Sequence, residues 1–291
     1  MRESRFCSSK PAEKIANRVT VVCMRWGRAF SQDYVKVLYH GVKKNLSRDF
    51  EFVCLSDDPQ PVCDGVRIAP IPDINLPGKR WRDGGWPKLT VFKPGLFPPD
   101  CPVLYLDLDL VILRSLDPFV ELLEQKRGLH ILREWNPVLW KPVPVRFRPD
   151  RGGQSSVFTF FPEEQTSIYE GFVRDQAKAF RVGYNDQSYI TRTANHVSYL
   201  PNDWAVSFKK HCVYYYPFNL VFKKIKKPRK AKVVVFHGDP KPVDLIRDDQ
   251  TKWGTDRKFG HGPVDWVKSY WNAGLKSVGQ GDAPQDCAAG G

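Results

Sequence analysis

The sequence predicts an α/β domain whose central sheet is mostly parallel and flanked by helices. Two observations favour this class. Short β-rich runs alternate with segments of helical periodicity through the first half of the chain. The strongest strand signal, residues 103–113, is apolar almost throughout, which is typical of a strand covered by helices on both faces. The 291 residues can bury a sizeable core, as one large domain or two small ones.

The first half of the domain is predicted from β-branched runs, helical spacing and capping residues. Strands are expected over residues 19–24, 50–55 and 66–71. Between the first two, Ser31 can cap a helix that runs to about residue 46, because apolar residues recur there at helical spacing. Pro87 suits the first turn of a short helix over residues 88–92, which leads toward the strand at residues 103–113.

The second half mixes strands and helices. Strands are expected over residues 129–135, 155–161, 197–200 and 232–236, and helices over residues 163–180 and 186–192. Residues 264–271 combine Trp and Tyr with Lys, which fits a C-terminal helix packed on the domain. A segment lying at a membrane interface is the alternative. The polar leader, residues 1–17, and the Gly/Ala-rich tail, residues 276–291, are expected to be disordered.

Charge and cysteine content narrow the class of protein. The net charge of +13 suits an anionic partner. Its densest part, residues 223–232, is either a solvated basic loop or a patch that meets anionic lipid headgroups. Nucleic acid is not expected, because no aromatic residues interleave with these basic ones. The seven cysteines are scattered, and neither a transmembrane run nor a secretory signal is evident, so the cytoplasm is the expected compartment.

Two aspartates interrupt the apolar run. Asp107 and Asp109 come late in the predicted strand, toward the carboxyl edge where α/β sheets bind ligands. Side chains two residues apart in an extended segment point the same way, and buried carboxylates need a partner. A divalent cation is the simplest partner, since it takes oxygen ligands. The alternative is an edge strand whose carboxylates lie in water or pair with arginine.

A second polar group follows the last predicted strand. His237 enters a turn stiffened by glycine and proline, and Lys241 comes four residues later. Two carboxylates and one imidazole make a three-ligand site that suits Mn²⁺ or Mg²⁺ and leaves positions open for phosphates. Lys241 would add a further cation for the same phosphates. Taken alone, His237 is more simply a turn residue.

With these motifs the chain resembles the retaining sugar-nucleotide glycosyltransferases of the GT-A fold, specifically the glycosyltransferase family 8 group of glycogenin and bacterial lipopolysaccharide galactosyl- and glucosyltransferases. The resemblance covers about residues 19–242. Its motifs are Tyr105-Leu106-Asp107-Leu108-Asp109, Lys88-Leu89-Thr90-Val91-Phe92, Asp186-Gln187 and His237…Lys241-Pro242. The chain departs from the family in the shorter spacing between His237 and Lys241, in the missing Trp after Pro242, and in Gln154-Ser155-Ser156, which replaces Asn-Ser/Ala-Gly.

The resemblance implies a single large domain of the GT-A fold over residues 18–275, with a Rossmann-like sheet. Its nucleotide-binding half would span residues 18–115 and its acceptor half residues 116–275. It implies an enzyme that moves a hexose from a nucleoside diphosphate sugar, UDP-Glc or UDP-Gal by default, to a saccharide or glycolipid acceptor with retention of configuration. Polysaccharide or lipopolysaccharide synthesis is the setting that it suggests. A glycolipid acceptor would bring the protein into peripheral contact with an anionic membrane at its inner face.

The resemblance also assigns the metal and its phosphates. Asp107, Asp109 and His237 are implied to hold Mn²⁺ or Mg²⁺, and Asp107 also to reach the ribose. Lys241 is implied to bind the diphosphate as it leaves, and Lys88 to contact the phosphates or the donor sugar.

Further roles concern the sugar and the base. Asp186 and Gln187 match the position beneath the sugar ring, although Asp186 also fits a helix N-cap. The base and ribose are expected against the first strand and the loop after the second, at Cys23, Met24, Trp26 and Asp57.

Two other functions remain open on the sequence alone. An inverting GT-A transferase or a nucleotidyltransferase would also use paired aspartates with a metal. A basic non-catalytic module that binds membrane or nucleic acid would depend on residues 223–232 and would not need the aspartates.

Overall fold

The computed structural model describes residues 18–137, 140, 142–222 and 224–279. Its centre is a seven-stranded sheet in the order β3–β2–β1–β4–β7–β6–β8. The strands are β1 (Arg18–Arg25), β2 (Asp49–Ser56), β3 (Val66–Pro70), β4 (Val103–Leu106), β6 (Leu129–Arg133), β7 (Gly153–Phe160) and β8 (Val197–Tyr199). The leader that we expected to be disordered, residues 1–17, lies outside the described residues.

Strand pairing in this sheet is mostly parallel, as predicted. β1 pairs in parallel with β2 and β4, β2 with β3, and β6 with β8, whereas β7 runs antiparallel to β4 and β6. The carboxyl ends of β1, β2 and β4 therefore meet at one edge. Because β7 is antiparallel, its first residues reach the same edge, where Asp107 N donates to Ser156 O at 2.9 Å. This register brings the start of β7 beside Asp107.

The strand predicted over residues 103–113 is in fact two strands in two sheets. β4 ends at Leu106, and β5 (Leu110–Ile112) joins β10 (Val233–Val235) and β9 (Ala205–Ser207) in a three-stranded sheet. Asp107 and Asp109 therefore lie in the connection between the sheets and not within a strand. The chain changes sheet here because β5 pairs antiparallel with β10, next to a bond from Phe236 N to Asp109 O of 3.1 Å.

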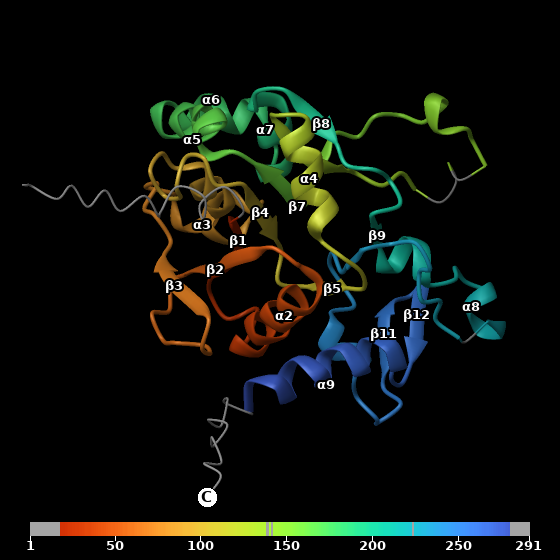
Figure 1. Cartoon of the computed structure of the whole chain (residues 1–291). Coiled ribbons are helices and arrows are strands. Elements are labelled where there is room, and N and C mark those ends of the chain that lie inside the picture. Colours follow the sequence, from red (N-terminus) through yellow and green to blue (C-terminus); the bar gives the residue numbers. More distant parts are fainter. Residues whose placement is uncertain (1–17, 138–139, 141, 223, 280–291) are drawn as a thin grey trace, which may run out of the picture.

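Helices cover both faces of the large sheet (Figure 1). One face carries α2 (Gln32–Asn45), α4 (Asp117–Gln125) and α9 (Asp265–Gly279), and the other carries the 3₁₀ helix η1 (Trp86–Phe92), α5 (Thr166–Arg174), α6 (Gln176–Val182) and α7 (Asp186–Thr193). Neighbouring residues of β1 alternate between the two cores, so that Val21 faces the first and Val22 the second. This double cover explains why residues 19–24 of β1 and all of β4 are buried and almost entirely apolar.

The remaining elements are short. They are α3 (Gly78–Arg82), η3 (Val145–Phe147), η4 (Pro162–Glu164), the π-helix η5 (Phe208–Cys212), α8 (Phe218–Val221), η6 (Pro242–Leu245) and a hairpin of β11 (Lys252–Thr255) and β12 (Lys258–His261). The hairpin and α8 lie beyond the three-stranded sheet (Figure 1), and Trp253 of the hairpin shares a core with Val267 of α9.

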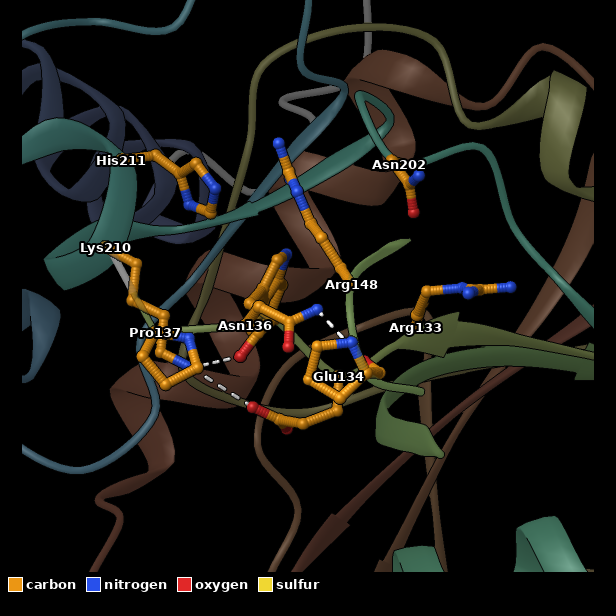
Figure 2. Close-up of a pocket in the computed structure, with 10 residues that line it drawn as sticks. Arg133, Glu134, Asn136, Pro137, Arg148, Asn202, Lys210 and His211 are labelled. Carbon is orange, nitrogen blue, oxygen red and sulfur yellow. Dashed lines mark hydrogen bonds and ion pairs between the residues drawn. The ribbon is translucent and has the colours of Figure 1, made fainter. Parts of the chain in front are cut away.

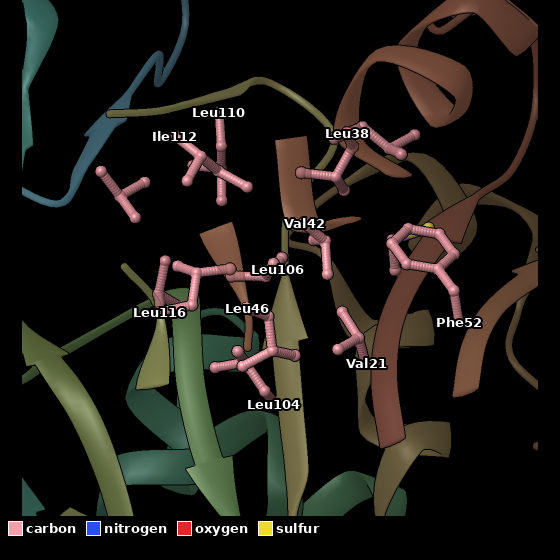
Figure 3. Close-up of a cluster of buried hydrophobic side chains, with 14 of the residues drawn as sticks. Val21, Leu38, Val42, Leu46, Phe52, Leu104, Leu106, Leu110, Ile112 and Leu116 are labelled. Carbon is pink, nitrogen blue, oxygen red and sulfur yellow. The ribbon is translucent and has the colours of Figure 1, made fainter. Parts of the chain in front are cut away.

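The core beneath α2 fixes the end of β4. Figure 3 shows Leu38 and Val42 of α2 beside Val21 of β1 and Leu104 and Leu106 of β4, all of them buried. Burying each such side chain stabilises the fold by roughly 1.5–3 kcal/mol relative to exposing it. Asp107 therefore follows directly on one of the most firmly packed strands of the molecule.

Two predictions about helices need correction. The helix expected over residues 163–180 is divided among η4, α5 and α6, because the Asp175 side chain accepts a hydrogen bond from Lys178 N at 2.8 Å and starts a new helix. The tail expected to be disordered from residue 276 is helical through Gly279 as part of α9. Residues 280–291 lie outside the described residues.

The aromatic segment over residues 264–271 belongs to α9 and packs on the domain. Val267 and Trp271 are buried, and the Trp271 ring meets the Tyr34 ring of α2 edge-on, with centroids 4.7 Å apart. Packing on the domain, the first of the two interpretations of this segment, is the arrangement found. Within the described ranges, no helix is both long enough and apolar enough to span a bilayer.

Candidate active site

The carboxylate of Asp107 lies at the end of β4, between two side chains that donate to it. Lys88 Nζ is 2.8 Å from Asp107 Oδ1, and Tyr105 OH donates to the same oxygen at 3.0 Å. Lys88 projects from η1 and is buried, while Tyr105 belongs to β4 itself. The 3₁₀ helix η1 and the strand β4, which share one core, thus hold the first aspartate of the pair.

Asp186 completes this buried cluster from α7. Its Oδ2 lies 3.7 Å from Lys88 Nζ and accepts a hydrogen bond from Ser155 Oγ at 2.6 Å. Lys88 Nζ also donates to the Ser155 carbonyl at 3.0 Å. The structure excludes the N-cap role for Asp186, because Asn185 caps α7 by accepting from Ser188 N at 3.0 Å. Asp186 therefore stands in the first turn with its carboxylate turned inward.

Two glycines allow α7 to approach this closely. Gly84 and Gly85 have φ angles of 82° and 68°, which side chains other than hydrogen rarely permit. A Cβ at Gly85 would lie 2.7 Å from Asp186 Oδ1, and Gly84 O accepts from Asp186 N at 2.8 Å. The loop before η1 is thus shaped around the Asp186 carboxylate.

Burial and charge oppose each other in the cluster. Burial raises the pKa of Asp186, while Lys88 and the Ser155 hydroxyl oppose the rise. Burial also disfavours the Lys88 ammonium, but Asp107 and Asp186 outweigh it, so the pKa of Lys88 lies above its ordinary value. Lys88 is therefore held as a cation between two carboxylates.

Asp109 has a different environment. Among the described residues, its side-chain partner is Lys241, whose Nζ lies 2.5 Å from Asp109 Oδ2. Burial raises the pKa of Asp109 to about 6, and Lys241 moderates the rise. Lys241 comes from the segment between β10 and η6 and remains 29% exposed, with its Nζ 5.2 Å from the ring centroid of Phe30. A part-exposed lysine on a loop thus neutralises the second aspartate.

His237 follows β10 on the same side of the molecule. Its Nε2 is 2.7 Å from Ser207 Oγ, and its ring stacks on Trp135 with centroids 5.4 Å apart. Burial first, and then four surrounding lysines, lower the pKa of His237 to about 3. These lysines, which we call the lysine group, are Lys209, Lys210, Lys241 and Lys258. The imidazole is therefore neutral across the physiological range.

The three side chains expected to bind a metal are each engaged by another partner. Asp107 contacts Lys88, Asp109 contacts Lys241, and His237 contacts Ser207. Across the residues that the structure describes, no group of three or more His, Cys, Asp or Glu side chains is placed to hold a metal ion. In this arrangement the three residues do not fit a three-ligand cation site, although the neutral imidazole has the protonation state that a metal ligand needs.

The residues expected around the base and ribose divide into two pairs. Cys23 and Met24 of β1 are buried in the two cores, whereas Trp26 and Asp57 lie where the chain leaves the sheet. Trp26 Nε1 donates to Trp81 O at 3.1 Å, and Asp57 Oδ2 accepts from Gly27 N at 2.8 Å. All four therefore flank the carboxyl ends of β1 and β2.

A small cavity borders the site on the side of Trp135. Its volume is about 140 Å³, and it is lined by Arg133, Glu134, Trp135, Asn136, Pro137, Arg148, Pro149, Asn202, Lys210 and His211 (Figure 2). Lys210 Nζ donates to Trp135 O at 2.7 Å and lies 3.2 Å from Glu134 Oε1. Since Trp135 also stacks on His237, this polar cavity adjoins the candidate site.

The sequence did not point to several members of the site. Ser155 was noted only as a departure from a motif, and Tyr105 only as part of one. The lysine group comes from three separate segments. Trp135 was predicted only as the last residue of a strand over residues 129–135, whereas β6 ends at Arg133. Gln187 is placed as expected next to Asp186 and is half-buried.

Comparisons with known proteins agree with this geometry at the level of the fold. No family model matches the chain, and no curated protein matches its sequence. Among solved structures, the galactosyltransferase LgtC in complex with donor and acceptor sugar analogues superposes with a TM-score of 0.53 at 15% identity, over 92% of this chain and 98% of LgtC. The glycosyltransferase GlyE of Streptococcus pneumoniae gives 0.53 at 15% identity, over 89% of this chain and 65% of GlyE. The chain has the fold of these glycosyltransferases.

The predicted GT-A architecture is therefore confirmed. An active-site mutant of LgtC gives a TM-score of 0.54 over the same shares of both chains. The likeness to LgtC thus extends over nearly the whole of both chains.

Proposed function

We propose that the protein is a glycosyltransferase that moves a hexose from a nucleoside diphosphate sugar, UDP-Glc or UDP-Gal, to a saccharide or glycolipid acceptor with retention of configuration. One observation carries the proposal. Lys88, Asp107 and Asp186 converge at the carboxyl edge of a GT-A sheet, beside the pair of Asp109 and Lys241. LgtC, which has the same fold, was crystallised with donor and acceptor sugar analogues.

Cations near the site would stabilise the leaving diphosphate. Transfer of the sugar leaves negative charge on the two phosphates, and fixed cations aimed at that charge lower the barrier. Lys241 is the lysine best placed for this role, because it is part-exposed and, within the described part of the chain, its ion-pair partner is Asp109 alone. The rest of the lysine group raises the positive potential around it.

Asp186 and Gln187 would act on the sugar. Breaking the bond to the diphosphate builds positive charge at the anomeric carbon, which a fixed carboxylate nearby stabilises. Ser155 and Lys88 orient the Asp186 carboxylate, and the half-buried Gln187 would hydrogen-bond the sugar or the incoming acceptor. The Lys88 ammonium, shared by two carboxylates, sets the charge beneath the sugar.

A divalent cation remains part of the proposal as a prediction. Mn²⁺ or Mg²⁺ would act as a Lewis acid on the diphosphate. Binding by Asp107, Asp109 and His237 would require Asp109 to exchange Lys241 for the ion and His237 to release Ser207. Metal dependence is therefore a property to be measured apart from sugar transfer itself.

The proposal also assigns positions to the base of the donor and to the acceptor. The base and ribose would lie at Trp26 and Asp57, above the buried Cys23 and Met24. A glycolipid acceptor would place the protein at a membrane surface, and the basic residues 224–232 carry the charge that suits anionic headgroups.

A thermal-shift screen of nucleotide sugars tests the proposal. UDP-Glc or UDP-Gal should raise the melting temperature, because a ligand that binds only the folded state at 100 times its Kd stabilises it by about 2.7 kcal/mol. The Asp109→Asn variant should lose the shift. Asp100→Asn is the matched control, since Asp100 is exposed and precedes β4 at the opposite edge of the sheet.

Transfer itself is measured by release of the nucleoside diphosphate and by the anomeric configuration of the glycoside, with and without EDTA. Retention supports the proposal, whereas an inverted product replaces it with the inverting alternative. If no nucleoside diphosphate sugar shifts the melting temperature or is consumed, the proposal fails.

A further inference from the structure

Exposed apolar side chains gather in one short segment of the molecule. Nine large hydrophobic side chains are exposed among the described residues, and five of them fall within residues 216–222. The five are Tyr216, Phe218, Leu220, Val221 and Phe222, between 49% and 76% exposed. Single exposed hydrophobic residues are normal on a protein surface, but a contiguous group marks a binding surface.

The segment is held in place by its polar groups while its apolar side chains face outward. Asn219 is buried, and its Nδ2 donates to Phe259 O of β12 at 3.3 Å. Tyr216 N donates to Arg257 O at 3.1 Å in the turn of the same hairpin. α8 therefore sits at the periphery of the molecule, fixed to the β11–β12 hairpin (Figure 1).

Basic side chains adjoin this apolar segment. Lys224, Lys226, Lys227, Arg229 and Lys230 follow it in the chain, and no ion pair in the described part of the molecule neutralises them. A cavity of about 980 Å³ lies among both kinds of side chain, with Val221, Phe222 and Ile225 beside Lys226 and Lys227. The same surface thus offers apolar contact and uncompensated positive charge.

We propose that residues 214–232, with Lys223 left aside because it lies outside the described residues, form a surface that docks on an anionic lipid bilayer. The apolar side chains of residues 218–222 enter the headgroup and acyl boundary, and the basic side chains of residues 224–230 bind the lipid phosphates. The combination of apolar and basic side chains indicates which partner binds this surface. Uncompensated lysines favour a polyanion, and exposed Leu and Val side chains, which cannot stack on bases, favour lipid over nucleic acid.

The apolar side chains and the basic side chains should contribute similar free energies of binding to the bilayer. A fully buried Phe, Leu or Val side chain gains roughly 1.5–3 kcal/mol, and each basic residue near an anionic leaflet gains about 1 kcal/mol. Neither the apolar nor the electrostatic contribution alone anchors a protein firmly, just as a single covalently attached lipid chain gives only weak, reversible membrane binding. Binding should therefore need both the apolar residues and the anionic lipid.

One residue, His211, links this surface to the cavity that adjoins the candidate active site. His211 lines both the large cavity beside α8 and the small cavity of Figure 2, whose Trp135 stacks on His237. A docked bilayer would therefore lie next to the acceptor side of the site. The inference nevertheless rests on the surface itself and does not depend on sugar transfer.

Vesicle co-sedimentation of the full chain tests the proposal. The protein should bind vesicles rich in phosphatidylserine and bind phosphatidylcholine vesicles at least about tenfold more weakly. Phe218→Ser with Phe222→Ser should weaken binding to the anionic vesicles by about tenfold or more. Lys226→Glu with Lys227→Glu should do the same at low salt.

Two matched controls separate this surface from general stickiness and charge. Phe147→Ser removes an equally exposed aromatic ring elsewhere, and Lys178→Glu reverses an exposed lysine on α6; both variants should bind like the wild type. Circular dichroism checks the fold of each variant. Equal binding to neutral vesicles, or wild-type binding by either double variant, would overturn the proposal, and so would binding to duplex DNA without binding to vesicles.

Discussion

The two aspartates of the Asp107-Leu108-Asp109 motif are one residue apart, yet they lie in different kinds of environment. Asp107 meets Lys88 and Tyr105, which rigid elements hold, and it shares Lys88 with Asp186. Asp109 is more deeply buried as a residue but meets one lysine, and that lysine is part-exposed and stands on a loop. The first pair is built into the core, whereas the second can be exchanged.

This difference follows from the change of sheet between the two residues. Asp107 continues β4, which lies between β1 and β7 in the large sheet, and Asp109 precedes β5 in the small one. A charge held by packed elements is preorganised and needs no rearrangement when substrate binds. A charge held by one flexible lysine can instead be traded for a phosphate or a cation. We call Asp107 with Lys88 the fixed half of the motif, and Asp109 with Lys241, whose contact can be exchanged, the responsive half.

Removing the fixed lysine should have the largest effect. In Lys88→Met the apolar stem is kept, but Asp107 and Asp186 face each other without a cation. Breaking a buried ion pair from one side costs about 3–5 kcal/mol of unfolding free energy, and sugar transfer should be lost as well. Urea denaturation followed by fluorescence measures the first effect.

The control for this variant is Lys36→Met. Lys36 pairs with Asp33 at 3.4 Å on the surface of α2, where an ion pair is worth about 0–1 kcal/mol. A loss below about 1 kcal/mol in Lys88→Met would show that the cluster is not a structural unit.

Removing the responsive lysine should cost less stability than removing Lys88 and should impair binding. Lys241→Met should cost about 1–3 kcal/mol in unfolding free energy, because Lys241 is part-exposed but the Asp109 carboxylate that loses its partner is buried. It should lower kcat/KM for the donor by about 10- to 100-fold, since a charge-assisted contact with a phosphate is worth about 1.5–3 kcal/mol. Lys252→Met, in the exposed pair with Asp256, is the control and should leave both values unchanged.

The same variant also tests the metal prediction. With Lys241 gone, the Asp109 carboxylate has no cation, so Mn²⁺ should bind more tightly to Lys241→Met than to the wild type in a titration followed by electron paramagnetic resonance. If Mn²⁺ binds to neither protein, the Mn²⁺ or Mg²⁺ expectation is wrong. If Lys241→Met unfolds as readily as Lys88→Met, the contrast between the two aspartates is wrong.

The sequence predicted the fold more completely than it predicted the candidate site. Long apolar runs and helical spacing placed most elements of the large sheet, because burial on both faces leaves a strong local signal. The break between Leu106 and Leu110 left no such signal, since both sides of it are equally apolar. It depends on the pairing of β5 with β10, which lies more than 100 residues away in the chain.

Site residues were predictable where they belong to a motif and not where register decides. Asp107, Asp186 and Lys88 were named from motifs, and the structure brings them together. Ser155 reaches Asp186 only through the antiparallel register of β7 with β4, and the lysine group assembles from three segments. Such contacts arise from tertiary packing that no local pattern encodes.

The smallest predicted effect is the pH dependence of donor affinity and stability that Lys258 of the lysine group causes. Burial first, and then Lys210, lower the pKa of Lys258 to about 8, so this lysine loses its charge on mild alkalinisation. Donor affinity should fall by up to ~5-fold as the pH rises through 8, because part-exposed charges interact by about 1 kcal/mol or less. Stability should change in the opposite direction over the same range. The unfolded chain binds the proton more strongly between pH 8 and the ordinary lysine pKa, so unfolding free energy rises with pH there.

Lys258→Arg separates these effects from any general influence of alkali. The guanidinium stays charged to beyond pH 12, so both the donor KM and the contribution of this residue to stability should become flat between pH 7 and 9.5. KM measured across that range, together with urea unfolding at each pH, tests whether Lys258 causes the pH dependence of donor affinity and stability. A KM that rises equally in wild type and Lys258→Arg would assign the pH dependence to another group, and the responsive half of the site would then be Lys241 alone.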